Sequence, residues 1–273
     1  MHKPLISIVM AAKNAEGTIS AAIASVLQQD YENWELLVVN NASSDQTQAK
    51  IDAFSDPRIR TFSCVTPGVS SARNTALNQT KGSLLCFLDA DDYLPGSSLR
   101  KREERFSRLP EVAFVDGLVH FYNLNFEHLT RIHSPTLQNS NPFAELLALQ
   151  GSCFAGITWM VRWDSENNTR FDSSLTHGED LLFFTSLAAK GGNYAFVDTD
   201  VYHVQTTPNS AMRDLSGQEA GYKLLEERFS DLSQNKSWRP VFRKKARRIL
   251  IRSYLKRAQF LAATRVVFRY LKT

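Results

Sequence analysis

Short apolar runs alternate with amphipathic segments along the first third of the chain. The apolar runs, which are typical of strands buried on both faces, occupy residues 5–10, 36–39, 59–62 and 83–88. Segments with apolar positions at helical spacing follow them, ending at residue 27 and covering 43–54 and 70–78. This alternation predicts an α/β fold with a mostly parallel central sheet flanked by helices.

The second half of the chain is less regular. Its patterns predict strands at 112–115, 118–122 and 156–161, and helices at 143–149 and from about 179 to 191. No internal repeat interrupts this order. We therefore expect the same sheet to continue through a less symmetrical region.

Polar side chains gather where three of the predicted strands end, at residues 11–14, 40–44 and 89–92. Ligands of parallel sheets bind at these carboxyl ends. Asp89, Asp91 and Asp92 directly follow a buried apolar run, and carboxylates so close repel one another unless a cation neutralises them. Mg²⁺ and Mn²⁺ prefer such oxygen ligands. The alternative is a helix-capping Asp beside two solvated turn acids.

Composition places the chain among ordinary globular proteins. It has 273 residues, 43% hydrophobic and 22% charged. Its three cysteines are widely spaced, and its histidines show no tight ligand spacing, so neither a disulfide framework nor a zinc motif is indicated. The first apolar run is too short for a signal peptide or a membrane span. We expect a cytoplasmic protein, with peripheral attachment to the inner face of the membrane left open.

Basic residues are concentrated at the C-terminus. Residues 232–273 contain 13 Lys and Arg and no acid, whereas residues 1–231 carry 19 bases against 28 acids. Apolar positions recur among these bases at helical spacing, which predicts a tail of basic amphipathic helices. The tail could pack on the domain, contact an anionic membrane or bind nucleic acid. We rank nucleic acid last because no recognition motif accompanies the charge.

Five segments together carry a family resemblance. They are Ser7–Asn14, Val38–Thr47, Gly68–Asn74, Phe87–Leu94 and Gly178–Asp180. In order and spacing they resemble the motifs of inverting glycosyltransferases of family 2, which have the GT-A fold. The resemblance covers residues 5 to about 210.

The resemblance implies a donor, a metal and a base. The donor would be a nucleotide-diphosphate sugar held with Mn²⁺ or Mg²⁺, which assists the leaving diphosphate as a Lewis acid. Asp91 would bind the metal, with Asp89 near the ribose and the metal. Asp180 would take the proton of the acceptor hydroxyl as its oxygen attacks the anomeric carbon. The nucleotide-sugar contacts implied are Ala11, Asn14, Asn41, Asp45, Arg73, Asp89, Ala90 and Asp91.

Two departures from the family pattern concern the nucleotide and the metal. Asn40 and Asn41 stand where an aspartate pair is usual, which leaves the nucleobase open. Tyr202 and His203 stand where many relatives have a Tyr-Arg-x-His element, so His203 is either a further metal ligand or a packed side chain.

The resemblance also implies an organisation and an acceptor. Residues 1–231 would form the catalytic domain, with a nucleotide-sugar half (1–92) and an acceptor half (93–231), followed by the tail at 232–273. The acceptor would be a glycan or a lipid-linked saccharide of bacterial surface polysaccharide synthesis, bound around 116–132 and 151–158. A nucleotidyltransferase should show a glycine-rich loop after the first strand, where this chain has only Gly17. A non-catalytic binding module could have lost its acids, whereas Asp89, Asp91 and Asp180 are all present here.

Overall fold

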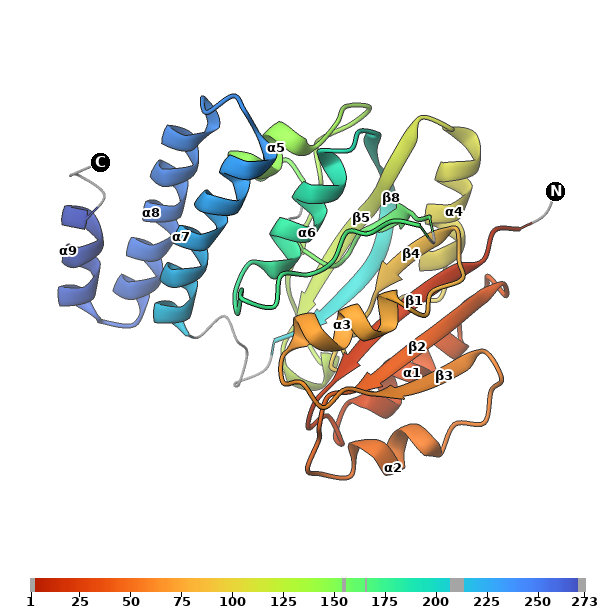
Figure 1. Cartoon of the computed structure of the whole chain (residues 1–273). Coiled ribbons are helices and arrows are strands. Elements are labelled where there is room, and N and C mark those ends of the chain that lie inside the picture. Colours follow the sequence, from red (N-terminus) through yellow and green to blue (C-terminus); the bar gives the residue numbers. More distant parts are fainter. Residues whose placement is uncertain (1–2, 154–155, 165, 207–213, 270–273) are drawn as a thin grey trace.

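The computed structural model describes residues 3–153, 156–164, 166–206 and 214–269 (Figure 1). One eight-stranded sheet runs through these residues in the order β3-β2-β1-β4-β7-β5-β6, with β8 paired to β5. The strands are β1 Ile6–Ala12, β2 Trp34–Asn40, β3 Ile59–Ser63, β4 Leu84–Phe87, β5 Val112–Tyr122, β6 Leu129–His133, β7 Met160–Arg162 and β8 Asn193–Gln205. The predicted α/β class is thereby confirmed.

Two parallel blocks meet in the sheet. Strands β1 to β4 pair in parallel, and β5 pairs in parallel with β8. The short strand β7 joins the blocks by pairing antiparallel to both β4 and β5, and β6 is antiparallel to β5. Strand β2 is buried along nearly its whole length, as its continuous apolar sequence predicts for a strand covered on both faces.

Helices cover both faces of the parallel block. In Figure 1, α3 crosses in front of β1 and β2 while α1 lies behind them. The helical elements are α1 Ile19–Leu27, α2 Thr47–Asp52, α3 Val69–Leu77, α4 Ser98–Arg108, η1 Leu124–Phe126, α5 Phe143–Leu147, α6 Glu179–Ala188, α7 Leu215–Leu232, α8 Trp238–Lys256 and α9 Phe260–Arg269.

The clearest differences from the sequence-based boundaries are found at three segments. The helix expected at 43–54 begins only at Thr47, because the amides of Ser43 and Ser44 donate to the side chains of Asn40, at the end of β2, and Asn14, in the loop after β1. The strands expected at 112–115 and 118–122 are one strand, β5. It runs through Gly117, where a Cβ would lie 2.6 Å from Val201 of β8.

The strand expected at 156–161 begins only at Met160. Thr158 instead serves a buried polar network: its carbonyl accepts from Arg102 (2.8 Å) and its hydroxyl donates to Asp116 (3.0 Å). Arg102 and Asp116 have no exposed surface. Satisfying these buried charges takes precedence over extending the sheet.

The C-terminal helices are not equivalent. Helix α8 packs on α7 and α5, and its Trp238, Phe242 and Ala246 belong to the main hydrophobic core. Helix α9 packs on α8 through a separate small cluster that includes Ala263 and Val266. Residues 270–273 of the predicted tail lie outside the described residues. Within the described part of the chain, none of the helices has the length and apolar character of a membrane span.

Candidate active site

An acidic tip follows β4. Each of Asp89, Asp91 and Asp92 offers one carboxylate oxygen, and these three oxygens lie within 4.8 Å of one another. Burial, and then the charge of Asp89, raise the pKa of Asp91 to about 6. The tip therefore holds like charges at close range, as the sequence predicts, and its oxygen ligands suit a hard divalent cation.

The three acids of the tip have different partners. Asp92 is buried and accepts from the amide of Gln205 (2.8 Å) and from the Tyr202 hydroxyl, so it joins the tip to β8. Burial, followed by the charges of Asp89 and Asp91, raises the pKa of Asp92 well above its usual range. The Asp89 amide donates to the same hydroxyl (3.0 Å). Asp92 thus shapes the tip, and the less buried Asp89 and Asp91 carry its accessible carboxylates.

A buried arginine joins the tip to the start of α6. Arg73 of α3 donates to Asp89 (2.9 Å) and to Glu179 (3.1 Å), and its side chain is 5% exposed. Burial opposes the charge on this guanidinium, but Asp89, Glu179 and Asp180 together raise its pKa. The resemblance assigned Arg73 to the nucleotide. In the structure its charge is shared between the two acidic segments of the site, which brings Asp89 and Glu179 together across 90 residues of sequence.

Asp180 lies in the first turn of α6. The helix is preceded by Gly178 at φ 81°, a left-handed conformation that disfavours side chains, and a Cβ there would lie 2.7 Å from Leu225 of α7. Glycine therefore lets α7 pack against the turn that carries Asp180. Burial, and then the neighbouring Glu179, raise the pKa of Asp180 to about 7, against the lowering effect of Arg73. A carboxyl group in that range is suited to proton transfer near neutral pH.

An aromatic cluster fixes the two acidic segments relative to each other. Phe87, the last residue of β4, packs edge-on against Phe171, Phe183 and Phe184 at centroid distances of 5.4 to 6.1 Å. Phe171 and Phe183 are stacked at 4.2 Å. Because Phe183 and Phe184 follow Asp180 by one helical turn, packing in this cluster sets the separation of the β4 tip from α6.

Residues of the loops after β1 and β2 bond to one another. The Asn14 side chain accepts from the backbone amide of Ser44 (2.9 Å), and the backbone amide of Asn14 donates to the Ser43 hydroxyl (3.0 Å). Asp45 accepts from the amides of Glu16 (3.1 Å) and Thr47 (3.0 Å). The structure thus brings the predicted Asn14 and Asp45 together at one edge of the sheet. Ala11 is the second-last residue of β1, half-buried and paired with Val39 of β2.

The side chain of Asn41 forms hydrogen bonds within the protein. Its side-chain amide donates to the carbonyls of Cys64 (3.0 Å) and Thr66 (2.7 Å), and its oxygen accepts from the amide of Gly68 (2.9 Å). The side chain is buried and holds the loop that leads into α3. Ala90 is also buried, between the two accessible acids of the tip.

His203 does not join the acidic tip. Its ring nitrogen lies 2.9 Å from Asp200, and its ring stacks on His120 of β5 at 5.3 Å. It contacts Tyr93, the residue after Asp92, through two backbone hydrogen bonds (2.9 and 3.0 Å) and by stacking of the two rings at 5.7 Å. The His203 side chain thus groups with His120 and Asp200, apart from the three carboxylates of the tip.

A cavity of about 630 Å³ opens beside Asp180. One wall comes from the two segments expected to bind an acceptor, represented by Arg131, Gly151 and Cys153. Residues 154–155 of the second segment lie outside the described residues. A further wall comes from α7 and α8, including Tyr222 and Ile249. The sequence analysis missed this wall because its helical pattern has no chemical motif to mark it.

Comparisons with known proteins point to one family. The model of the family "Glycosyl transferase family 2" matches residues 7–162. WfgD of Escherichia coli, a UDP-Glc:alpha-D-GlcNAc-diphosphoundecaprenol beta-1,3-glucosyltransferase, is 52% identical over 126 residues, which cover 46% of this chain and 49% of that protein. The match therefore spans about half the length of this relative.

Two solved structures share the fold. S. aureus TarS, in complex with UDP-GlcNAc, superposes with a TM-score of 0.66 at 15% identity, over 98% of this chain and 91% of that one. The mannosyltransferase PcManGT from Pyrobaculum calidifontis, in complex with GDP-Man and Mn²⁺, gives a TM-score of 0.62 at 17% identity, over 98% and 74%.

Proposed function

Since the chain belongs to glycosyl transferase family 2, we propose that it transfers a sugar, with inversion, from a nucleotide-diphosphate sugar to a hydroxyl group of a glycan or lipid-linked saccharide. The observation that carries the proposal is the Arg73 bridge. It holds the acidic tip and the turn of Asp180 side by side. A site for a diphosphate and a site for a proton acceptor then lie at one edge of the sheet.

The donor would bind at the loops after β1, β2 and β4. We propose that Asp89 and Asp91 hold Mn²⁺ or Mg²⁺, because they are the accessible carboxylates of the tip and their like charges need a counter-charge. When bound, the metal would neutralise charge on the leaving diphosphate. The nucleoside would lie against Asn14, Asp45 and Ala11. Asn41 would support this nucleoside site by holding the loop of Gly68.

The chemical step would be a single displacement with Asp180 as the base. The acceptor oxygen attacks the anomeric carbon, the bond from that carbon to the diphosphate breaks, and the nucleoside diphosphate leaves. The acceptor's proton passes to the Asp180 carboxylate. A pKa raised to about 7 lets this group be ionised and still be a useful base near neutral pH.

The cavity beside Asp180 would hold the acceptor. Its apolar wall of α5, α7 and α8 residues suits an acceptor with an apolar portion. The similar WfgD is named for a diphosphoundecaprenol-linked acceptor. We therefore place this chain in bacterial surface polysaccharide synthesis, with residues 1–92 as the nucleotide-sugar half and 93–231 as the acceptor half.

We further propose that the C-terminal helices contact an anionic membrane surface at its inner face. Arg248, Arg252 and Lys256 recur at four-residue spacing on the exposed side of α8. Phe260 and Leu261 at the start of α9 are 63% and 78% exposed. Each basic residue near anionic lipid contributes roughly 1 kcal/mol. Nucleic acid is not among the proposed partners.

Two assays test these proposals. Nucleotide-sugar turnover should be measured with UDP-, GDP-, CDP- and dTDP-sugars and Mn²⁺, using GlcNAc-diphospho-undecaprenol as acceptor. The purified chain should form product with at least one donor, and Asp180→Asn and Asp91→Asn should each reduce it at least about a hundredfold. Donor binding without product, or product unaffected by Asp180→Asn, would defeat the assignment.

The membrane proposal calls for vesicle pelleting at two salt concentrations. Changing Arg248, Arg252 and Lys256 to Gln should release the chain from anionic vesicles. The control changes the exposed bases Lys50, Lys81 and Arg108 to Gln, which alters net charge equally. Equal pelleting of the two variants would contradict a role for the α8 surface.

A further inference from the structure

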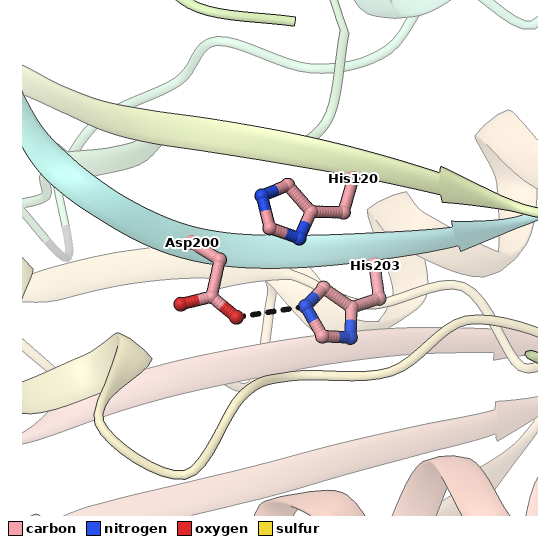
Figure 2. A group of neighbouring side chains, drawn as sticks. All are labelled: His120, Asp200 and His203. Carbon is pink, nitrogen blue, oxygen red and sulfur yellow. Dashed lines mark hydrogen bonds and ion pairs between the residues drawn. The ribbon is translucent and has the colours of Figure 1, made fainter. Parts of the chain in front are cut away.

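We propose that His120, Asp200 and His203 form a second metal site, for a transition-metal ion such as Zn²⁺, separate from the cation site at the acidic tip. One ligand atom from each of the three side chains lies within 4.8 Å of the other two. Figure 2 shows the two imidazole rings one above the other on neighbouring strands, with the Asp200 carboxylate beside them.

The strand pairing brings the three side chains together. His120 of β5 and His203 of β8 are partners in the parallel register, so their Cα positions are set by the sheet. The register shifts between Asp200 and Tyr202, which turns Asp200 toward the same side as His203. Ligands on two paired strands are held more firmly than ligands on loops.

His120 has an unsatisfied nitrogen. Its Nε2 atom is buried without a hydrogen-bond partner within the described part of the chain. Buried polar atoms nearly always have a partner, so this one requires an explanation. By contrast, Nε2 of His203 already lies 2.9 Å from Asp200. A metal ion bound by both rings and the carboxylate would satisfy the orphaned nitrogen.

The donor set selects the class of metal. Two imidazoles and one carboxylate suit Zn²⁺ and other first-row transition metals, whereas Mg²⁺ prefers oxygen ligands alone. Ligand atoms on a tetrahedral Zn²⁺ lie about 3.4 Å apart. The three ligand atoms now lie within 4.8 Å of one another, so the rings must turn to bring these atoms closer on binding the ion. Three protein ligands would leave one position for water or for another ligand.

The second site is connected to the acidic tip through Tyr93. The backbone of His203 is bonded to Tyr93, the next residue after the tip, and its ring stacks on the Tyr93 ring at 5.7 Å. A bound ion would tie β5 to β8 and hold this support in place. The two sites use different residues, so each can be removed without changing the ligands of the other.

Zinc titration by calorimetry tests the proposal, in the full chain carrying Asp89→Asn and Asp91→Asn so that the tip cannot bind. We expect one Zn²⁺ per chain and a rise in melting temperature on adding it, with no competition from millimolar Mg²⁺. His120→Gln should weaken binding at least about tenfold, because losing even a hydrogen-bond partner of a ligand costs that much. The matched control is His128→Gln, which changes an exposed histidine outside the cluster.

Three results would overturn the second site. They are absence of zinc binding in the tip variant, equal weakening by His128→Gln and His120→Gln, or full competition by Mg²⁺. If His120→Gln fails to fold, Asp200→Asn decides, because it keeps the shape of the side chain and removes its charge. Zinc binding that survives Asp200→Asn unchanged would also refute the assignment. Glycosyl transfer does not enter this test, so it stands apart from the proposed function.

Discussion

Replacing Arg73 with methionine removes the cation that pairs with both Asp89 and Glu179. The methionine can fill much of the same space, so the change tests charge more than volume. Two carboxylates would then face each other near Asp180 without their present counter-charge. We expect both the stability of the fold and the geometry of the site to suffer.

The size of the effect follows from the burial of each partner. Arg73 is 5% exposed and Glu179 13%, so this pair counts as buried, and breaking such a pair costs about 3–5 kcal/mol. Asp89 is 37% exposed, so its pair is screened by solvent and adds at most about 1 kcal/mol. Most of the loss should therefore come from the uncompensated charge of Glu179.

Urea unfolding of the two variants and the wild type measures this effect. Arg73→Met should lose about 3–5 kcal/mol of unfolding free energy. Arg73→Met combined with Glu179→Gln should recover about half of that loss, because the second change removes the stranded charge. A loss below about 1 kcal/mol in the single variant, or a double variant no more stable than the single one, would refute the argument.

The remaining predictions concern Asp180, its turn and the packing behind it. Asp180→Asn should abolish transfer yet raise the melting temperature at about pH 8. Burial, and then Glu179, raise the folded-state pKa of Asp180 to about 7, so the wild-type carboxyl is ionised at pH 8 at a cost to the folded state. A lower melting temperature of the variant would contradict this. Transfer by the wild type should decline as the pH falls through about 7, where Asp180 gains a proton, and a rate profile flat to about pH 5 would argue against Asp180 as the base. Gly178→Ala should cost about 1–3 kcal/mol in urea unfolding and lower kcat, because the added Cβ would meet Leu225 and the backbone φ at this position is 81°. Wild-type unfolding free energy and wild-type kcat would show that the turn has room for the side chain. Phe87→Ala should cost about 3–5 kcal/mol by the same method, whereas less than about 1.5 kcal/mol would mean that the aromatic cluster can collapse.

The parallel block was predictable because its signals are local. Strands β1, β2 and β4 are buried on both faces, so their sequences are nearly continuous apolar runs whose ends are visible in the chain. The acids after β4 follow such an end directly. The predicted boundaries were wrong where a distant side chain forms a hydrogen bond with the backbone. Asn14 accepts from the Ser44 amide before α2, and Arg102 donates to the Thr158 carbonyl.

The hydrogen-bond and ion-pair partners of the candidate site residues could not be predicted from the sequence. Arg73 and Asn41 were singled out from the motifs, but Arg73 pairs with acids 16 and 106 residues away and Asn41 bonds to the β3–α3 loop. Nothing in the local sequence specifies which distant groups will lie within hydrogen-bonding distance.

By itself, the sequence determined the α/β class, the acidic tip after the fourth strand and the excess of bases at the C-terminus, because each depends on neighbouring residues alone. Only the tertiary structure decided that Arg73 would join Asp89 to Glu179, that α7 and α8 would wall the cavity beside Asp180, and that His203 would meet His120 instead of the tip. Those contacts arise from strand register and helix packing. Register and packing are set by burial over the whole chain, so no short segment contains them.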